Sequence, residues 1–104
     1  MKNQGANKAL PHLRKKSAEV AALLKQMTHP QRLLILCSLA EGEKSVGEIE
    51  SACGASQSAV SQFLKGMRVS RLIASRREGK LIYYRIVDKR VLELIQSLYR
   101  IFCR

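Results

Sequence analysis

Hydrophobic side chains along the chain follow two different patterns. Over most of its length they stand three or four residues apart, the spacing of one face of an α-helix. This pattern predicts helices over about 15–27, from 28–31 to Gly42, and over 46–52, 56–69 and 89–103. The runs 72–77 and 81–87 are shorter, surround a glycine, and the second is rich in β-branched and aromatic residues, which predicts a β-hairpin. We therefore expect a mainly α fold with a small β-hairpin.

Polar residues at the predicted helix starts refine these boundaries. Thr28 is the expected N-cap of the second helix, with Gln31 completing a capping box. Ser45 and Glu48 form a second capping box before the third helix. The tight turn 53–55 then contains Gly54, which can take a positive φ. Helix, short glycine-containing turn and helix is typical of a helix-turn-helix motif.

The helix 56–69 has two different faces. Its apolar residues recur at helical spacing and should face a core: Val60, Phe63, Leu64 and Met67. The opposite face carries side chains that can read base edges or phosphates in a DNA major groove. These candidate DNA-binding residues are Ser56, Gln57, Ser58, Ser61, Gln62 and Lys65. An ordinary amphipathic surface helix would show the same pattern, so the helix alone does not decide between the two interpretations.

The predicted hairpin carries basic side chains on its first strand and tip. These are Arg76, Arg77 and Lys80, and they directly follow the candidate groove-binding helix. A basic hairpin in that position is typical of a wing, which lies along the DNA backbone or in the minor groove beside the helix. The order of helix-turn-helix and then basic hairpin is more specific than either part.

The charge of the chain is distributed unevenly along its length. The 104 residues carry a net charge of +11, and residues 56–90 hold nine bases against two acids. Residues 17–55 are slightly acidic, so the positive charge gathers on the tail and the presumed DNA-binding half. With no apolar signal segment or membrane-spanning run, we expect a cytoplasmic protein without membrane contact. Three cysteines, an odd number, argue against a disulfide framework.

The last helix has more apolar surface than a small domain usually buries by itself. Its stripe comprises Val91, Leu94, Ile95, Leu98, Ile101 and Phe102. A second copy of the chain is the simplest partner for this stripe, which predicts a homodimer. Alternatively, the stripe only covers the core of its own chain.

Four segments together resemble the ArsR/SmtB family of winged-helix repressors. They are LLKQMTHPQRLLILCSL, SVGEIE, SQSAVSQFLKGMR and REGKLIYYRI, and the resemblance covers about residues 17–103. It implies a homodimer joined through the first and last helices that binds a palindromic double-stranded operator. We accordingly expect residues 1–14 to be a flexible basic tail and residues 15–104 one winged helix-turn-helix domain for DNA binding and dimerisation.

The chain departs from that family at three positions. Phe63 stands where many members have His, and Gly66 lies within the groove-binding helix, where glycine costs about 1 kcal/mol relative to alanine. Arg71 replaces the glycine usual after that helix, so we expect the positive-φ position there to be either strained or locally rearranged. These departures leave the fold prediction intact.

Metal sensing is the best-known role of the family, but a ligand set is hard to assemble here. The third helix offers Glu48 and Glu50, with no cysteine until Cys53 at its end, and the last helix has Asp88 and Glu93 but no histidine. The two histidines, His12 and His29, lie far from the last helix in sequence. A tetrahedral zinc site needs about four ligands. We therefore predict no metal site and no cofactor.

Cys37 and Cys103 point to thiol chemistry instead. Their positions, on the second helix and at the end of the last, resemble the sulfide- and persulfide-responsive branch of the family (the BigR and SqrR type) and the similar HlyU regulators. That resemblance implies a disulfide or polysulfide bridge between them. Cys103 is the expected attacking thiolate because Arg100 and Arg104 flank it and cations lower a thiol pKa. Cys37 could also be a plain core residue, and we interpret Cys53 as one.

The expected function is a dimeric DNA-binding repressor whose operator binding is switched by reactive sulfur species or other thiol oxidants. Two alternatives remain: an HlyU-like anti-silencing activator or architectural DNA binder, and a metal-responsive repressor. An enzyme is not expected, because the sequence contains no assembled nucleophile and base and no glycine-rich phosphate loop.

Overall fold

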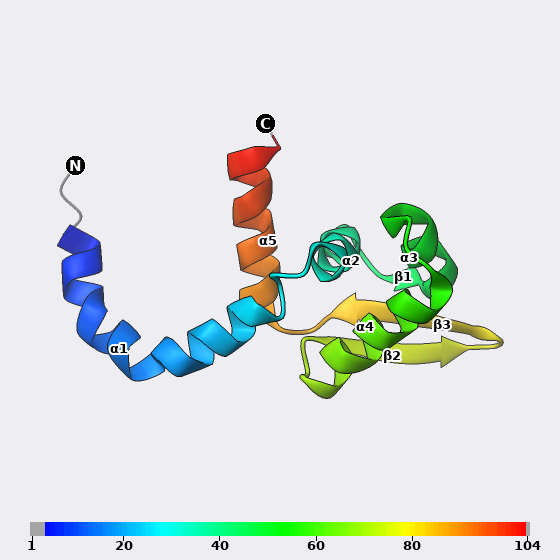
Figure 1. The fold of residues 1–104 in the computed structure, drawn as a ribbon, viewed down its shortest axis with the longest axis horizontal. Helices are drawn as coiled ribbons and strands as arrows, with labels where there is room; N and C mark the ends of the chain where they lie inside the picture. Colours follow the sequence, from blue (N-terminus) through cyan, green and yellow to red (C-terminus); the bar gives the residue numbers. More distant parts are fainter. Residues whose placement is uncertain (1–3, 104) are drawn as a thin grey trace.

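The computed structural model describes the backbone of residues 4–103 and the side chains of residues 9–103. The fold is mostly helical with a small antiparallel sheet, as the sequence predicts (Figure 1). Its elements are α1 (Gln4–Lys25), α2 (Pro30–Ala40), β1 (Lys44–Ser45), α3 (Val46–Cys53), α4 (Gln57–Val69), β2 (Ile73–Glu78), β3 (Leu81–Ile86) and α5 (Lys89–Phe102). None of the described helices is long and apolar enough to cross a membrane.

The sheet has the order β1-β3-β2, and every neighbouring pair is antiparallel. The predicted hairpin is confirmed, with Glu78 opposite Leu81 and Gly79 at a φ of 63° in the connection. The strand β1 was not predicted. It contains only two residues, too few to show an alternating pattern, and it exists because Lys44 and Ser45 pair with Tyr84 and Tyr83.

One face of the sheet and the inner faces of α2 to α5 form the core. Ile73 of β2 is buried, and Tyr84 and Ile86 of β3 pack against the same cluster. The side chains buried to within 2 % exposure and largest in volume are Ile35, Leu36, Ile49, Leu64, Met67, Ile73, Ile95, Val60 and Val91. Branched aliphatic residues therefore make most of this core.

The start of α2 differs from the sequence prediction. His29, not Thr28, is the N-cap, and its Nδ1 accepts the backbone N–H of Gln31 at 3.0 Å. Thr28 Oγ1 instead donates to the carbonyl of Lys25 at 2.9 Å. Pro30 explains the shift, because proline suits the first helical position and the residue before it then becomes the cap. The second predicted capping box, between Ser45 and Glu48, is confirmed in both directions.

The first helix begins earlier than predicted. It starts at Gln4 rather than Lys15 and contains Pro11, and Figure 1 draws it with a pronounced bend. A proline inside a helix removes one backbone hydrogen bond and clashes with the preceding turn, which bends the helix. The expected start at Lys15 is therefore wrong. The flexibility of residues 1–14 and the domain boundary after them stay predictions.

The turn after α4 keeps the positive φ, which is the strained one of the two alternatives expected at Arg71. Arg71 has a φ of 63° and is the only non-glycine residue in the described chain with a positive φ. Its backbone N–H donates to the carbonyl of Arg68 at 3.0 Å, and that of Leu72 donates to the carbonyl of Met67 at 3.0 Å. These bonds close the end of the helix and direct the chain into β2.

Candidate nucleic-acid interface and thiol site

The helix α4 presents its polar face to solvent. Ser56 caps it by accepting the N–H of Ala59 at 3.2 Å, while Val60, Leu64 and Met67 are buried against the core. All six candidate DNA-binding residues of this helix are exposed: Ser56, Gln57, Ser58, Ser61, Gln62 and Lys65. A fixed inner face and a free outer face suit a helix that enters a groove, and we call α4 the recognition helix.

Phe63 does not join the buried stripe completely. Its ring is half-buried on one flank of the recognition helix. The His29 ring lies 4.7 Å away, centroid to centroid, and the guanidinium carbon of Arg32 lies 5.5 Å from the Phe63 centroid. The sequence pattern assigned Phe63 to the core and did not single out Arg32, because their contact joins two helices far apart in the chain.

The wing places its adjacent arginines on opposite faces of the sheet. Successive strand residues point to opposite sides. Arg77 therefore shares the side of Ser75, whose hydroxyl accepts a 3.5 Å hydrogen bond from Arg68 of the recognition helix. Arg76 points to the other side, away from that helix. Lys80 is exposed at the tip.

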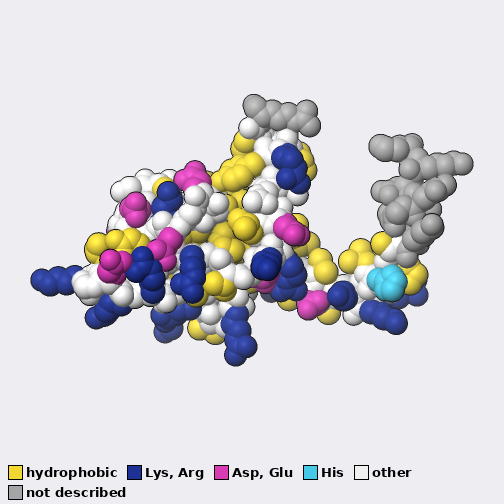
Figure 2. Space-filling view, turned by 180° about the vertical axis from the view of Figure 1, so that it is seen from behind, with side chains coloured by type: hydrophobic (Ala, Val, Ile, Leu, Met, Phe, Trp, Pro, Cys, Tyr) yellow, Lys and Arg dark blue, Asp and Glu magenta, His cyan; other side chains and the backbone are white. Residues whose placement is uncertain are grey.

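Arg76 is engaged by acidic partners within the chain. It donates to both carboxylate oxygens of Glu43, at 2.9 and 2.7 Å, and to Glu78 at 2.6 Å, and its guanidinium carbon lies 4.8 Å from the centre of the Tyr83 ring. Three of the five guanidinium N–H donors are therefore used within the chain. Arg77 and Lys80 are in no ion pair among the described residues. Figure 2 shows Lys and Arg side chains along the lower edge of the molecule, from the wing tip towards α1.

Cys37 and Cys103, the predicted thiol pair, lie in one place. Both line an apolar cavity of about 230 Å³ between α2 and α5, together with Leu33, Leu98, Tyr99 and Phe102. The Tyr99 hydroxyl donates to the Cys37 carbonyl at 2.8 Å and so ties the end of α5 to α2. All three cysteines are free thiols. Tyr99 was missed from the sequence, although it stands four residues before Cys103, one turn along the same helix face.

The two thiols differ in their surroundings. Burial raises the pKa of the Cys37 thiol, the nearby Tyr99 hydroxyl opposes this, and a charge on Cys103 adds to it. Cys103 is exposed, whereas Cys37 is half-buried. Burial also raises the pKa of Tyr99 to about 12, so its hydroxyl stays a hydrogen-bond donor at neutral pH. Of the flanking cations, Arg100 donates to Ser97 at 2.8 Å, and Arg104 lies outside the described residues.

Comparison with known proteins fits this architecture. Residues 29–75 match the family model "Bacterial regulatory protein, arsR family". The biofilm growth-associated repressor of Agrobacterium fabrum is 45% identical over 94 residues, which span 90% of this chain and 80% of that protein.

The chain belongs to the ArsR family of bacterial regulatory proteins.

Other members of the ArsR family support the assignment. The transcriptional activator HlyU of Vibrio cholerae is 39% identical over 101 residues, covering 97% of this chain and 94% of that protein. The crystal structure of the repressor BigR from Xylella fastidiosa superposes with a TM-score of 0.86 at 42% identity, covering 90% of this chain and 96% of the other. These relatives are DNA-binding transcriptional regulators and not enzymes.

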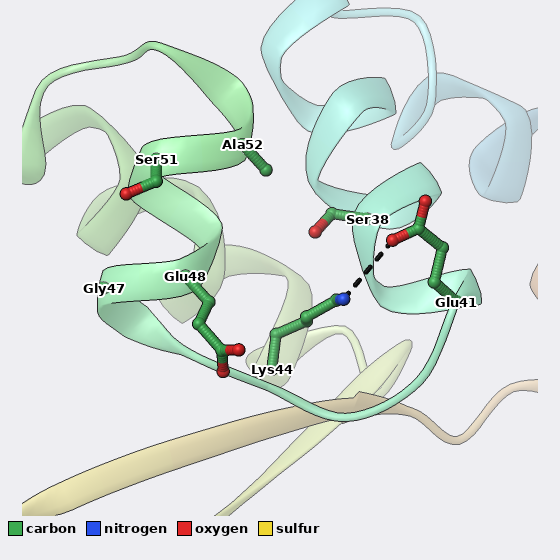
Figure 3. Close-up of a pocket in the computed structure, with 7 residues that line it drawn as sticks. All are labelled: Ser38, Glu41, Lys44, Gly47, Glu48, Ser51 and Ala52. Carbon is green, nitrogen blue, oxygen red and sulfur yellow. Dashed lines mark ion pairs between the residues drawn. The ribbon is translucent and has the colours of Figure 1, made fainter.

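This ArsR-family chain brings no metal-binding cluster together: among the described residues, no three His, Cys, Asp or Glu side chains are grouped. Glu48 is used by its capping box, and Asp88 caps α5 and pairs with Arg90 at 2.7 Å. A polar cleft of about 530 Å³ separates α2 from α3 (Figure 3). There Lys44 pairs with Glu41 at 3.3 Å, so the cleft holds charges of both signs rather than a set of ligands.

The helices α1 and α5 leave apolar surface uncovered. Leu24 is 44% exposed, Ile101 62% and Phe102 77%. Between these helices runs an apolar groove lined by Leu24, Met27, Thr28, Leu33, Leu94, Ser97, Leu98 and Ile101. In the predicted apolar stripe of α5, Val91 and Ile95 are buried and Leu94 and Leu98 are half-buried against the core, whereas Ile101 and Phe102 stay exposed.

Proposed function

We propose that this ArsR-family regulator is a homodimeric repressor that binds its operator in the reduced state and releases it when sulfur bridges Cys37 and Cys103. The observation that carries the proposal is the shared apolar cavity of these two thiols between α2 and α5. A covalent link there joins a core helix to the helix that bears the uncovered apolar face.

On DNA, we assign base readout to the exposed polar face of the recognition helix. Gln57 and Gln62 suit adenine, and Lys65 suits guanine or phosphate. Ser58 and Ser61 add tolerant contacts, whereas the Ser56 hydroxyl already caps the helix. For the wing, we assign phosphate binding to Arg77 and Lys80. We keep Arg76 as a brace between the wing and the loop before β1, because Glu43 and Glu78 hold its guanidinium.

The uncovered faces of α1 and α5 support the homodimer. Exposed aliphatic and aromatic side chains on adjacent helices favour burial against a second apolar surface. A two-fold dimer would also place two recognition helices on successive half-sites of a palindrome. Two relatives with high similarity to this chain bear the word "repressor" in their names, and the sign of regulation proposed here follows them.

Persulfide chemistry can form the bridge with balanced atoms and electrons. The Cys103 thiolate takes the outer sulfur of glutathione persulfide, and glutathione thiolate leaves; a second persulfide converts Cys37 in the same way. The Cys37 persulfide anion then attacks Cys103 Sγ, forming a trisulfide and expelling hydrosulfide. Overall, two thiols and two glutathione persulfides give one trisulfide, two glutathiones and one hydrogen sulfide. Cys103 reacts first because it is exposed and Cys37 is half-buried.

The bridge between Cys37 and Cys103 would change the affinity for DNA by acting on α5. It fixes the end of α5 against α2, and the same helix carries the proposed dimer face. A change there alters the spacing of the two recognition helices. Coupling free energies of about 1–3 kcal/mol are typical of allosteric proteins and correspond to about 5–150-fold in affinity.

The test is operator affinity by fluorescence anisotropy, with a labelled duplex from upstream of the protein's own gene. Reduced protein is compared with protein treated with glutathione persulfide, at fixed salt and with a chelator present. We expect a loss of affinity that reductant reverses and that Cys37→Ser abolishes. If Cys37→Ser still releases the duplex on treatment, the bridge is not the switch.

The similarity to HlyU favours a second candidate, an activator or architectural binder that counters silencing. Such a protein would use the same basic surface. Footprinting separates the two: a short palindrome supports the repressor, and broad coverage of AT-rich DNA supports the architectural role. A release that occurs only with added metal would instead point to a metal-responsive regulator.

A further inference from the structure

We propose that Arg32, seated on the ring of Phe63, is a second site for the DNA backbone, on the flank of the recognition helix away from the wing. Its ligand is a phosphate of the strand opposite the one held by the wing. The inference rests on the proposed DNA-binding function and adds a contact that the sequence did not indicate.

Arg32 lacks the carboxylate partners that two other arginines of the chain have. Arg76 and Arg90 are each paired with two carboxylates, whereas no carboxylate in the described chain pairs with Arg32. Its Nε is buried without a hydrogen-bond acceptor. Buried polar groups without partners are rare in folded proteins, and guanidinium stays charged. Because Nε is buried, the two terminal nitrogens of Arg32, which make no hydrogen bond in the described chain, are the atoms that can meet an anion from outside.

The position of Phe63 on the recognition helix places this cation at the groove. Phe63 and Arg68 are separated by about 140° around the helix axis, at 3.6 residues per turn. The buried Val60, Leu64 and Met67 lie in the shorter arc between them. The longer arc holds Ser58, Ser61, Gln62 and Lys65, while Gln57 lies in the shorter arc at the exposed start of the helix. Arg68 bonds Ser75 of β2, so its flank belongs to the wing. The flank of Phe63 is the other edge of the DNA-reading face.

A recognition helix in the major groove lies between two phosphate backbones. The wing reaches only one of them. Arg32 stands at the opposite edge, in the first turn of α2, with its guanidinium carbon 5.5 Å from the Phe63 centroid. Arginine combines stacking on aromatic faces with bidentate binding of phosphate, and phosphate contacts fix the register of a protein on the duplex. Between them, Arg32 and the wing would hold the recognition helix from both sides.

Phe63 is the positioning residue for this contact. Its ring holds the guanidinium by a cation–π interaction and reduces the number of orientations that the long side chain samples. The half-buried ring also contacts the ring of His29, whose centroid lies 4.7 Å away. His29 and Arg32, at the start of α2, therefore both pack against the recognition helix. Without the ring, Arg32 should keep its charge, but its guanidinium should no longer be held in one orientation.

The experiment compares wild type with Arg32→Gln, Arg32→Lys and Phe63→Leu, all reduced. Affinity is measured by anisotropy at several salt concentrations, on the upstream duplex and on a scrambled duplex of equal length. Circular dichroism and thermal unfolding check the fold of each variant. Arg32→Lys is the matched control, because it keeps the charge and removes the planar fork.

We expect Arg32→Gln to weaken binding to both duplexes by the same factor and to reduce the slope of log affinity against log salt by about 2 per dimer, close to 0.9 for each lost phosphate contact. Arg32→Lys should keep the wild-type slope, and Phe63→Leu should bind more weakly than wild type at an unchanged slope. An unchanged slope for Arg32→Gln overturns the inference, even if affinity falls through loss of stability. If wild-type protein shows no salt-dependent binding at all, the proposed function fails instead.

Discussion

The guanidinium of Arg76 donates to both carboxylate oxygens of Glu43, at 2.9 and 2.7 Å, and crosses the Tyr83 ring to do so. Tyr83 lies on β3, between β2 and β1 in the sheet, and Glu43 directly precedes β1. The pair therefore ties the base of the wing to the loop after α2, on the face of the sheet away from the recognition helix. A side chain that the sequence predicts as a DNA contact is thus paired with carboxylates of its own chain in the fold.

This placement predicts different roles for the two adjacent arginines of the wing. Arg77→Gln should weaken operator binding and reduce the salt slope by about 2 per dimer, because one phosphate contact is lost in each half-site. The double variant Glu43→Gln and Arg76→Gln removes one charge of each sign from the other face and should keep the wild-type slope. A reduced slope in the double variant would restore Arg76 as a phosphate ligand. Anisotropy titrations at several salt concentrations measure both.

The Glu43–Arg76 pair also predicts a pH dependence. The hydrogen bonds from Arg76 hold the pKa of Glu43 below its ordinary value of 4.5. A lowered pKa in the folded state means that the pair stabilises the wing above pH 4.5, and that this stabilisation is lost as the pH falls further. Nuclear magnetic resonance of the Glu43 carboxyl carbon follows it directly. We expect its titration midpoint to lie below 4.5 in wild type and to rise in Arg76→Gln; equal midpoints in the two proteins would contradict the assignment.

The three cysteines should react with alkylating reagents at different rates. Cys103 is exposed, whereas burial raises the pKa of both Cys37 and Cys53. At pH 7.5 we expect iodoacetamide to label Cys103 first, then Cys37, and Cys53 only when the protein unfolds, because the thiolate is the nucleophile. Peptide mass spectrometry over time gives the order. Labelling of Cys37 ahead of Cys103 would reverse the proposed sequence of persulfide transfer.

The uncovered face of α5 predicts a mutation that separates the proposed dimer. Ile101 is 62% exposed on the apolar stripe, and an aspartate there would bury a charge in the interface. Ile101→Asp should shift the protein to monomer in analytical ultracentrifugation and abolish tight operator binding. Gln96→Asp, on the exposed polar side of the same helix, is the matched control and should remain dimeric. A dimeric Ile101→Asp protein would move the interface elsewhere.

The strained turn after the recognition helix predicts a stabilising substitution. Arg71 has a φ of 63°, a conformation that costs a non-glycine residue about 1–3 kcal/mol. Arg71→Gly should raise the free energy of unfolding by about 1 kcal/mol, because part of the relief is offset by the greater freedom of glycine in the unfolded chain. Urea unfolding monitored by circular dichroism measures it. A loss of stability would mean that the Arg71 side chain makes a compensating interaction.

Features that depend on neighbouring residues were readable from the sequence alone. The helices and hairpin followed from spacing, and the Ser45–Glu48 capping box from two residues three positions apart. The positive-φ position at Arg71 followed from the resemblance, because the family usually has glycine there. Each reflects backbone sterics or hydrogen bonds that act within a few residues. Even the error at Thr28 was local, since Pro30 decides which residue becomes the cap.

Only the tertiary structure decided which chemical groups meet. Strand alternation places Arg76 and Arg77 on opposite faces, but packing of the helices on one face decides which arginine is turned towards the recognition helix. The meeting of Cys37 with Cys103, and of Arg32 with Phe63, depends on how separate helices pack, and no local spacing encodes that. The sequence by itself therefore determined the elements and the family, whereas the long-range packing determined which of the basic residues and thiols can act together.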